Sequence, residues 1–515
     1  MRAERWLAAL AALLFAAGLA RDATQRWVAA TDLPVLITET SPEILDREGR
    51  LLRLYTVEDG RWRLATTPEA VDPRYLEMLV AYEDKRFFTH PGIDPAAMLR
   101  AAGQALWHGE VVSGASTLTM QVARLLEESG TGQLSGKLRQ MRVALALEQR
   151  LTKREILGLY LARAPFGGNL EGVRAATLAW FGKEPARLTP AEAALLVALP
   201  QSPESRRPDR AREAAIRARN RVLSRMGGAG VLSPEDIAAA LTEPVPATRR
   251  PFPALAPHLT DLARTEAPLA LRQRLTLDAT LQASLETLAQ DALRTLPPDV
   301  SVAMVVADHA TGEILASVGS ASYGDGGARQ GFVDMTRASR SPGSTLKPLV
   351  YALAFDRGLA HPQTLIHDRP VAFGSYAPQN FDGAFRGELP VAEALRLSLN
   401  IPVVLLMHEI GPAHLMETMR RAGIAPALPG DQAGLAVALG GVGVSLTDLV
   451  QLYAMLAQGG AARPLSWREG DPPGDPRQVL NRAAAWQVTN ILAGLAPPPG
   501  AARGQLAYKT GTSYG

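Results

Sequence analysis

Residues 339–348 read SRSPGSTLKP and place Ser344 three residues before Lys347, directly after a Pro-Gly pair. On a helix, residues i and i+3 share a face, so the lysine amine can lie above the serine hydroxyl. A serine hydroxyl needs an adjacent base to act as a nucleophile, and a lysine in a dry, positively biased pocket can be that base. Taken alone, the pattern is common by chance, and an ordinary helix start with Lys347 in water is the simpler interpretation.

Two later motifs reverse this interpretation. SLN occupies residues 398–400, and KTGT occupies residues 509–512. Each is common on its own, as a helix-end cap or as an exposed strand. The order S-x-x-K, S-x-N, K-T-G, however, resembles the signature of penicillin-binding proteins and related β-lactamases. The sequence therefore predicts an active site around Ser344.

The residue types in these motifs fit an acyl-transfer reaction. Ser344 would attack a peptide carbonyl to form an acyl-enzyme, and Lys347 would take its proton. Ser398 would relay that proton to the leaving amine, with Lys509 holding the pair in a state of low proton affinity. The expected substrate contacts are the amide of Asn400, Lys509 and Thr510 at a terminal carboxylate, Gly511 beside the substrate strand, and the N–H groups of Ser344 and Thr512 at the oxyanion.

From about residue 296 the sequence predicts an α+β domain. Residues 301–319 hold two apolar runs around a Thr-Gly turn, which favours a hairpin. Helices are predicted from Ser344, in VAEALRLSLN and in LTDLVQLYAMLAQGG, and GQLAYKTGTS is predicted to be a strand. Because the resembling proteins continue with more strands and helices, we expect the domain at 296–515 to be incomplete.

The wider resemblance is to class A penicillin-binding proteins. RSPGSTLKP at 340–348, QNFDG at 379–383 and ALGGVGVSLTDLVQLYAMLAQGG at 438–460 are similar to their transpeptidase domain, which is β-lactamase-like. RAPFGG and GKLRQ are most similar to the 1C branch of the family. The resemblance implies a D-Ala-D-Ala peptide substrate, transfer of its acyl group to an amine of a neighbouring stem peptide, and covalent inhibition by β-lactam antibiotics.

The first half of the chain carries a second set of motifs. EDKRFFTHPG at 83–92 and GASTLTMQ at 114–121 read singly as a helix end and a helix cap, but together they resemble two hallmarks of the peptidoglycan glycosyltransferase family. The resemblance implies a lysozyme-like, mainly helical domain that polymerises lipid II, with Glu83 as general base. No cofactor is required, although Mg²⁺ or Mn²⁺ can accompany the lipid diphosphate. The residues implied to hold sugar and diphosphate are Asp84, His90, Ser116, Thr117, Gln121, Arg124, Lys137 and Gln140.

One position departs from the family pattern. The third block usually reads R-K-x-x-E, whereas residues 136–140 read GKLRQ, so Gln140 stands in place of a carboxylate. An amide can hydrogen-bond, but it supplies no negative charge and takes no proton. Either Glu83, Asp84 and the cations suffice, or polymerisation is slow. Glu148 is a candidate substitute, although a solvent-exposed helix position is the simpler interpretation.

The composition limits the class of protein. The 515 residues predict two or three domains, and 47% hydrophobic with 20% charged residues is typical of globular chains. The chain has no cysteine, which excludes disulfides and thiol catalysis, and its eight histidines show no metal-ligand spacing. The net charge is +3 and no nucleic-acid-binding motif is present. We therefore expect neither a protein-built metal site nor a nucleic-acid partner.

The N-terminus predicts export. Arg2 and Arg5 precede an unbroken apolar run at 6–20, which Arg21 and Asp22 end. The run is short of the ~20 residues of a membrane helix, so a signal anchor, a cleaved signal peptide and a buried helix all stay open. Positive charge before the run orients the N-terminus toward the cytoplasm. We expect a single-pass protein of the bacterial cytoplasmic membrane with its catalytic domains in the periplasm.

The expected protein is a membrane-anchored peptidoglycan synthase. Its partners would be lipid II, nascent peptidoglycan, the membrane and other cell-wall proteins. Two alternatives stay open: a hydrolase of the D,D-carboxypeptidase or β-lactamase type, and a penicillin-binding scaffold with weak glycosyltransferase activity. The expected segments are 1–30 (cytoplasmic tip and anchor), 31–65 (leader), 66–242 (glycosyltransferase), 243–295 (linker) and 296–515 (transpeptidase).

Overall fold

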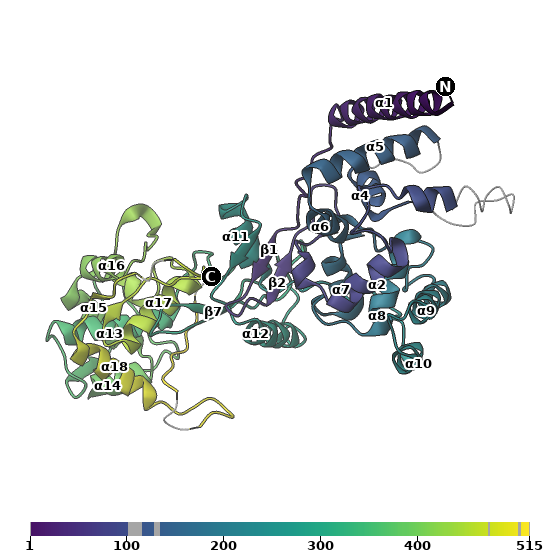
Figure 1. Cartoon of the computed structure of the whole chain (residues 1–515). Helices are drawn as coiled ribbons and strands as arrows, with labels where there is room; N and C mark the ends of the chain where they lie inside the picture. Colours follow the sequence, from purple (N-terminus) through teal and green to yellow (C-terminus); the bar gives the residue numbers. More distant parts are fainter. Residues whose placement is uncertain (1, 101–115, 128–133, 472–473, 503–505, 514–515) are drawn as a thin grey trace. The chain divides into compact units, whose positions relative to one another are not determined.

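The computed structural model describes residues 2–100, 116–127, 134–471, 474–502 and 506–513. The chain forms two compact units (Figure 1). The first consists of Met1–Pro42 and Leu54–Phe252, and the second of Glu43–Arg53 and Pro253–Gly515. Both units bury apolar side chains of their own.

The first unit is mainly helical, as the sequence predicts. Two short strands, β3 (Trp62–Arg63) and β4 (Leu170–Glu171), pair in parallel. Among the described residues, the helices of this unit include α1 (Arg2–Ala29), α2 (Pro73–Glu83), α4 (Leu118–Glu127), α5 (Leu134–Arg150), α6 (Lys153–Arg163), α7 (Val173–Phe181), α8 (Pro190–Ala198), α9 (Arg212–Gly228) and α10 (Pro234–Thr242).

Helix α8 is buried inside the first unit. Its start is fixed by a capping box: the Thr189 hydroxyl accepts a hydrogen bond from the Glu192 N–H (3.1 Å), and the Glu192 carboxylate accepts one from the Thr189 N–H (2.8 Å). Seven of its nine residues are buried. Helices α2 and α9 pack against it. This packing fixes the C-terminal end of α2, where Glu83 lies.

Helix α1 extends beyond the apolar run that the sequence marks. It continues through Arg21 and Asp22 to Ala29, because charged residues do not by themselves end a helix. Trp6–Ala29 is long and apolar enough to cross a membrane, and the most apolar 18-residue stretch of this helix is not buried within the protein. The interpretation of this segment as a buried helix is therefore wrong.

The second unit mixes strands and helices, as predicted. Three strands form one sheet in the order β2-β1-β5, and β6 with β7 forms the predicted hairpin. The helices of this unit are α11 (Pro257–Glu266), α12 (Ala279–Ala292), α13 (Lys347–Asp356), α14 (Val391–Arg396), α15 (Asn400–Ile410), α16 (Pro412–Arg421), α17 (Leu446–Ala457) and α18 (Arg482–Ala493). The strands are β1 (Glu43–Leu45), β2 (Leu51–Leu54), β5 (Arg272–Arg274), β6 (Met304–Ala307), β7 (Ile314–Val318), β8 (Leu365–Asp368), β9 (Gly387–Pro390), β10 (Ala461–Ala462) and β11 (Arg477–Gln478).

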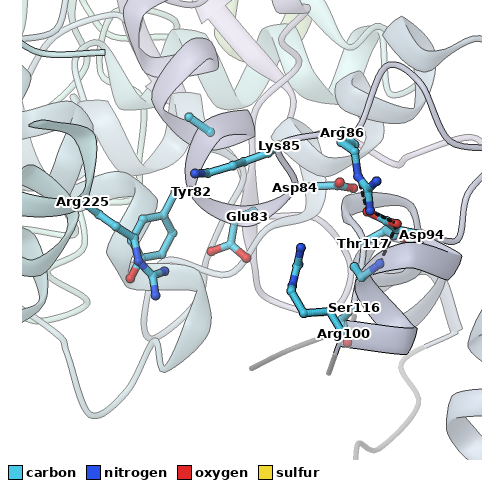
Figure 2. Close-up of a pocket in the computed structure, with 12 residues that line it drawn as sticks. Tyr82, Glu83, Asp84, Lys85, Arg86, Asp94, Arg100, Ser116, Thr117 and Arg225 are labelled. Carbon is cyan, nitrogen blue, oxygen red and sulfur yellow. Dashed lines mark hydrogen bonds and ion pairs between the residues drawn. The ribbon is translucent and has the colours of Figure 1, made fainter. Parts of the chain in front are cut away.

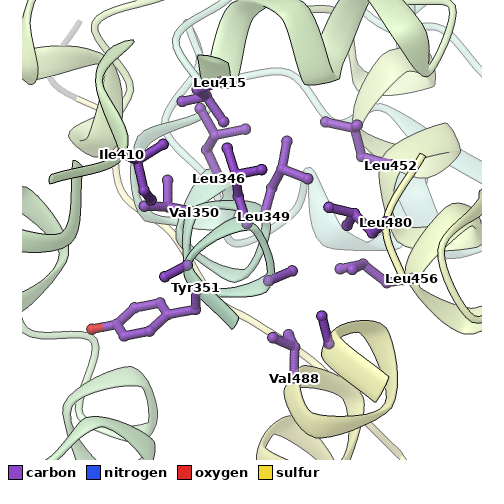
Figure 3. Close-up of a cluster of buried hydrophobic side chains, with 14 of the residues drawn as sticks. Leu346, Leu349, Val350, Tyr351, Ile410, Leu415, Leu452, Leu456, Leu480 and Val488 are labelled. Atoms are coloured by element: carbon purple, nitrogen blue, oxygen red, sulfur yellow. The ribbon is translucent and has the colours of Figure 1, made fainter. Parts of the chain in front are cut away.

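The core of the second unit surrounds helix α13 (Figure 3). Nine of the ten residues of this helix are buried. Leu349 and Val350 belong to the same cluster as Ile410 of α15, Leu452 of α17 and Val488 of α18. Because neighbouring helices enclose α13, the residue that begins it has a fixed position away from bulk water.

Two segments fold differently from the predicted organisation. Residues 43–53, predicted as part of a leader, supply β1 and β2 to the second unit, where β1 pairs in parallel with β5. Residues 257–292, predicted as part of a linker, form α11, β5 and α12 of that unit. The Pro-rich composition marks only the stretch before Pro257, where α11 begins.

The KTGT motif is not a strand, contrary to the prediction. A strand is defined by a ladder of backbone hydrogen bonds to a neighbour. Residues 506–513 form no such ladder with any other described residue. Strand formation depends on a paired neighbour, which the local composition of GQLAYKTGTS does not specify.

Candidate functional site

Lys347 lies at the centre of the serine motifs. It is the first residue of α13 and is 0% exposed. Its Nζ donates to the carbonyl oxygens of Ser398 (2.6 Å) and Leu399 (3.1 Å) and to Oδ1 of Asn400 (2.6 Å), and Ser398 Oγ lies 3.5 Å from it. Ser344 lies in the 3₁₀ turn directly before α13. The S-x-x-K and S-x-N motifs therefore meet at one amine.

Ser398 has an unusual backbone conformation. Its φ is +56°, in the left-handed region that non-glycine residues rarely adopt. It lies in the short turn between α14 and α15, and Lys347 binds the carbonyl oxygen that this turn presents. Such strain persists only where surrounding contacts enforce it, and it clusters at functional sites.

The backbone of the KTGT motif lies directly against the turn that carries Ser344. A Cβ atom at Gly511 would lie 2.6 Å from Cγ2 and 2.9 Å from the backbone N of Thr345. A Cβ atom at Gly343 would lie 2.3 Å from the carbonyl oxygen of Thr512. Only glycine fits these positions without moving the backbone. The side chains of Thr510 and Thr512 are exposed and open to a ligand.

Both lysines of the site have lowered pKa values. Burial, and then the charge of Lys509, lowers the pKa of Lys347 from 10.5 to about 7. Burial lowers the pKa of Lys509 from 10.5 to about 8. Near pH 7, Lys347 therefore exchanges between the ammonium, which can donate to all three acceptors, and the free amine, which donates to two and can accept a proton.

The sequence motifs did not single out two buried polar residues beside this site. Asn380, inside the QNFDG stretch, is 5% exposed and accepts the Asn400 N–H at its Oδ1 (2.8 Å). Asp368 is 0% exposed and accepts hydrogen bonds from the Asn380 amide. The position of Asn380 within the QNFDG motif was the available signal for the first, whereas the second is an ordinary strand-end residue.

In the first unit, Glu83 lines a cleft of about 570 Å³ (Figure 2). The side chains of Lys85, Arg86, Arg100 and Arg225 also line it. Asp94 pairs with Arg86 (2.9 Å) and Arg225 lies over the ring of Tyr82 (4.7 Å). The cleft thus holds four cationic side chains beside three carboxylates, those of Glu83, Asp84 and Asp94, and its cations suit an anionic ligand.

A second, smaller cleft shares Glu83 and Ser116 with the first. Gln121 and Arg124 reach it from α4, and Lys137 and Gln140 reach it from α5. The structure thus gathers most of the residues predicted to hold sugar and diphosphate beside the predicted base.

Neutral amides hold the Glu83 carboxylate. Gln121 Nε2 donates to one oxygen (2.8 Å), and Gln201 Nε2 donates to the other (2.7 Å). Arg206 in turn donates to the Gln201 side-chain oxygen (3.0 Å). The sequence did not single out Gln201, although it lies in a block that matches the family. Because amides orient a carboxylate without cancelling its charge, this arrangement suits a base.

Asp84, His90 and Thr117 bond to protein groups instead of pointing freely at a ligand. His90 Nε2 donates to Asp84 (2.9 Å), which also accepts the Leu118 N–H at the start of α4 (2.9 Å). The Thr117 hydroxyl donates to the Gly92 carbonyl oxygen (2.6 Å). These bonds fix the start of α4, and Asp84 and Thr117 also line the cleft at Glu83, so their predicted contact with substrate stays a prediction. The preceding motif residues 114–115 lie outside the described residues.

Glu148 is neither solvent-exposed nor a substitute base. Its side chain is 9% exposed, and its carboxylate accepts hydrogen bonds from Lys153 Nζ (2.7 Å) and Thr119 Oγ1 (2.6 Å). It does not line either cleft. Both interpretations of this residue are wrong, because the α5 face that carries it packs against α4.

The comparisons with known proteins agree with this geometry. Residues 49–227 match the transglycosylase family, and residues 302–514 match the penicillin binding protein transpeptidase domain. These matches confirm the predicted order, a lysozyme-like helical domain followed by a transpeptidase domain.

Several known proteins are similar to most of the chain. Penicillin-binding protein 1C of Escherichia coli is 44% identical over 99% of this chain, and penicillin-binding protein 1F of Bacillus subtilis is 28% identical over 93%. The chain spans 66% and 70% of the lengths of these two relatives. A solved structure of penicillin-binding protein 1A from Haemophilus influenzae covers 90% of this chain, and 80% of that chain is covered, with a TM-score of 0.47 and 18% identity. The two domain matches and the similarity to penicillin-binding protein 1C show that the chain belongs to the class A penicillin-binding proteins.

Proposed function

We propose that the protein is a bifunctional peptidoglycan synthase, which polymerises lipid II and cross-links stem peptides through a serine acyl-enzyme. The observation that carries this proposal is the convergence of the serine motifs on Lys347, a buried amine with a pKa of about 7. A hydrolase would share this serine chemistry. The glycosyltransferase unit before it favours synthesis, because that unit makes the strands that a transpeptidase joins.

In the glycosyltransferase reaction, Glu83 acts as the general base. It takes the proton of the acceptor sugar hydroxyl while the oxygen attacks the anomeric carbon of the lipid-diphosphate donor with inversion. Gln121 and Gln201 hold the carboxylate in place. Arg124 and Lys137 neutralise the charge that grows on the departing diphosphate. Gln140 contributes a hydrogen bond rather than charge.

A divalent cation enters this proposal only as a companion of the lipid diphosphate. Within the part of the chain that the structure describes, no group of three or more His, Asp or Glu side chains could hold a metal ion. The cations and amides that line the smaller cleft at Glu83, Arg124, Lys137, Gln121, Gln140 and Gln201, can bind phosphate directly. We therefore assign no step to a metal.

In the transpeptidase reaction, Ser344 attacks the carbonyl of the D-Ala-D-Ala bond and Lys347 takes the serine proton. The N–H groups of Ser344 and Thr512 stabilise the oxyanion, a contribution of roughly 3–4 kcal/mol per donor in other enzymes. Ser398 passes the proton to the departing D-alanine amine. An amine of a second stem peptide then attacks the ester, which frees Ser344 and forms the cross-link.

The two lysines predict a bell-shaped pH dependence for acylation by penicillin. Acylation needs neutral Lys347, so its rate should rise with pH up to about 7, the pKa of that lysine. It also needs charged Lys509 to hold the carboxylate, so the rate should fall above about 8. Because the two lysines interact, the two apparent pKa values of this bell-shaped profile belong to the pair of lysines and not to either residue alone.

Lys509→Arg tests this assignment. Arginine keeps its charge at all accessible pH values, so the alkaline limb should disappear while the acid limb remains. The measurement is the second-order rate constant for labelling by a fluorescent penicillin between pH 5 and 10. An alkaline limb that persists unchanged in this variant contradicts the role of Lys509.

The proposed location is the bacterial cytoplasmic membrane, with α1 as the anchor and both catalytic units in the periplasm. Three observations support it: the apolar exposed helix, the arginines before it, and a substrate that is itself a lipid. Lipid II, nascent peptidoglycan, β-lactams and other cell-wall proteins are the proposed partners.

Product analysis from lipid II tests the proposed function. Purified protein in detergent or vesicles should yield glycan strands, and muramidase digestion of these should release cross-linked peptide dimers. Penicillin should leave the strands but remove the dimers. Strands with trimmed, unlinked peptides would instead show a hydrolase, and an absence of strands would leave a penicillin-binding scaffold.

A further inference from the structure

A chain of hydrogen bonds connects Lys347 of the serine site, through Asn400 and Asn380, to the buried carboxylate of Asp368. Asp368 is the last residue of β8 and is 0% exposed. Asn380 Nδ2 donates to both of its oxygens (2.8 and 2.9 Å), and the Arg386 backbone N–H donates to one of them (2.8 Å). A buried carboxylate without such partners would be costly, so these donors are required for its burial.

The carboxylate permits only one orientation of the Asn380 amide. Nδ2 faces Asp368 and the Ala384 carbonyl oxygen (2.8 Å), so Oδ1 points the other way and accepts the Asn400 N–H (2.8 Å). A flipped amide would set oxygen against carboxylate and N–H against N–H. Asp368 thereby fixes the acceptor that Asn380 offers to Asn400.

Hydrogen bonds hold both the backbone and the side chain of Asn400. It is the first residue of α15, and the first N–H groups of a helix have no partner within the helix. Asn380 supplies that partner, and the Gln379 carbonyl oxygen accepts the Asn400 Nδ2 (2.7 Å). The remaining side-chain atom, Oδ1, then faces Lys347 Nζ at 2.6 Å.

We propose that Asp368 and Asn380 are positioning residues for acylation, which act through Asn400 to hold the amine of Lys347 in place beside Ser344. The inference rests on the proposed function of the serine site. Neither residue needs to touch the substrate. Their effect is on the geometry of the base.

The variants Asp368→Asn and Asn380→Ala test this in the full-length protein. Each should lower the maximal rate constant of acylation by a fluorescent penicillin by about 10²-fold, the effect of a misplacement of ~1 Å. The dissociation constant of the initial penicillin complex should change little, because the carboxylate-binding residues stay in place. The final fraction of labelled protein should match the unmodified protein, since misfolding lowers this fraction and poor positioning lowers the rate.

The double variant distinguishes two explanations of the slower acylation: one connected chain of contacts, or two independent structural defects. If both residues act through Asn400, Asp368→Asn combined with Asn380→Ala should be no slower than the slower single variant. Independent damage would instead multiply the two losses, to about 10⁴-fold.

Asp382→Asn is the matched control. Asp382 lies in the same loop, pairs with Arg386 at the surface with 51% side-chain exposure, and does not bond to Asn400. Its rate constant should stay within about twofold of the unmodified protein, as for most surface substitutions.

Single variants that label as fast as Asp382→Asn would overturn the inference, and so would a double variant with multiplied losses. If Asp368→Asn fails to fold, the test rests on the acylation rate constant of Asn380→Ala, with the final labelled fraction of that variant as the check on its folding. Failure of the proposed function gives a different result, since Ser344→Ala would then still be labelled.

Discussion

Ser344→Ala is expected to abolish covalent labelling by a fluorescent penicillin. The β-lactam ring is opened by the serine oxygen, and alanine offers no nucleophile in its place. Removal of the nucleophile from a serine hydrolase costs about 10⁶-fold in rate, which puts the labelling of this variant below detection. Gel fluorescence measures the loss, and mass analysis of the peptide around Ser344 locates the adduct in the unmodified protein.

Ser339→Ala is the control for this experiment. Ser339 lies five residues earlier on the same approach to α13 and is exposed, so its removal should leave labelling intact. Polymerisation of lipid II should continue in both variants, because the first unit carries that reaction. Labelling that survives in Ser344→Ala would remove this serine from the mechanism.

Glu83→Gln is expected to stop the growth of glycan strands from lipid II. Glutamine keeps the size of the side chain and can still bond to Gln121 or Gln201, but it takes no proton. A general base contributes about 10²–10⁴-fold to rate, so strand synthesis should fall by that amount with the fold intact. Gel separation of labelled strands measures their number and length.

Glu77→Gln is the control for the base. Glu77 lies on the same helix α2 but lines neither of the clefts at Glu83. Strand growth should be normal in this variant, and penicillin labelling should be normal in both. Normal strand growth in Glu83→Gln would reject the assignment of the base.

Features set by neighbours in sequence were predictable. The capping box at Thr189 and the hairpin of β6 and β7 depend on residues a few positions apart, so their signals are local. The meeting of Lys347 with Ser398 and Asn400 was a different kind of prediction. A separation of 51 residues, as between Lys347 and Ser398, says nothing about distance in space, so only the resemblance to a family could bring these motifs together in advance.

Features set by distant partners were not predictable in this way. Asp368 and Gln201 belong to unremarkable strand-end and turn sequences, and their importance comes from what the fold places opposite them. Glu148 looked like a surface residue until the packing of α5 on α4 buried it. The KTGT segment shows the same limit, because a strand exists only with a paired neighbour.

The two glycines that bring KTGT against the nucleophile turn restrict how bacteria could evolve resistance through this enzyme. Any side chain at Gly343 or Gly511 collides with main-chain atoms of the opposite segment. A substitution there would weaken antibiotic binding only by moving apart two backbone segments, the turn at Gly343 and the KTGT segment, which the proposed peptide substrate also needs in place. A substitution at either glycine would therefore also displace the neighbouring N–H groups of Ser344 and Thr512, which are the proposed oxyanion donors.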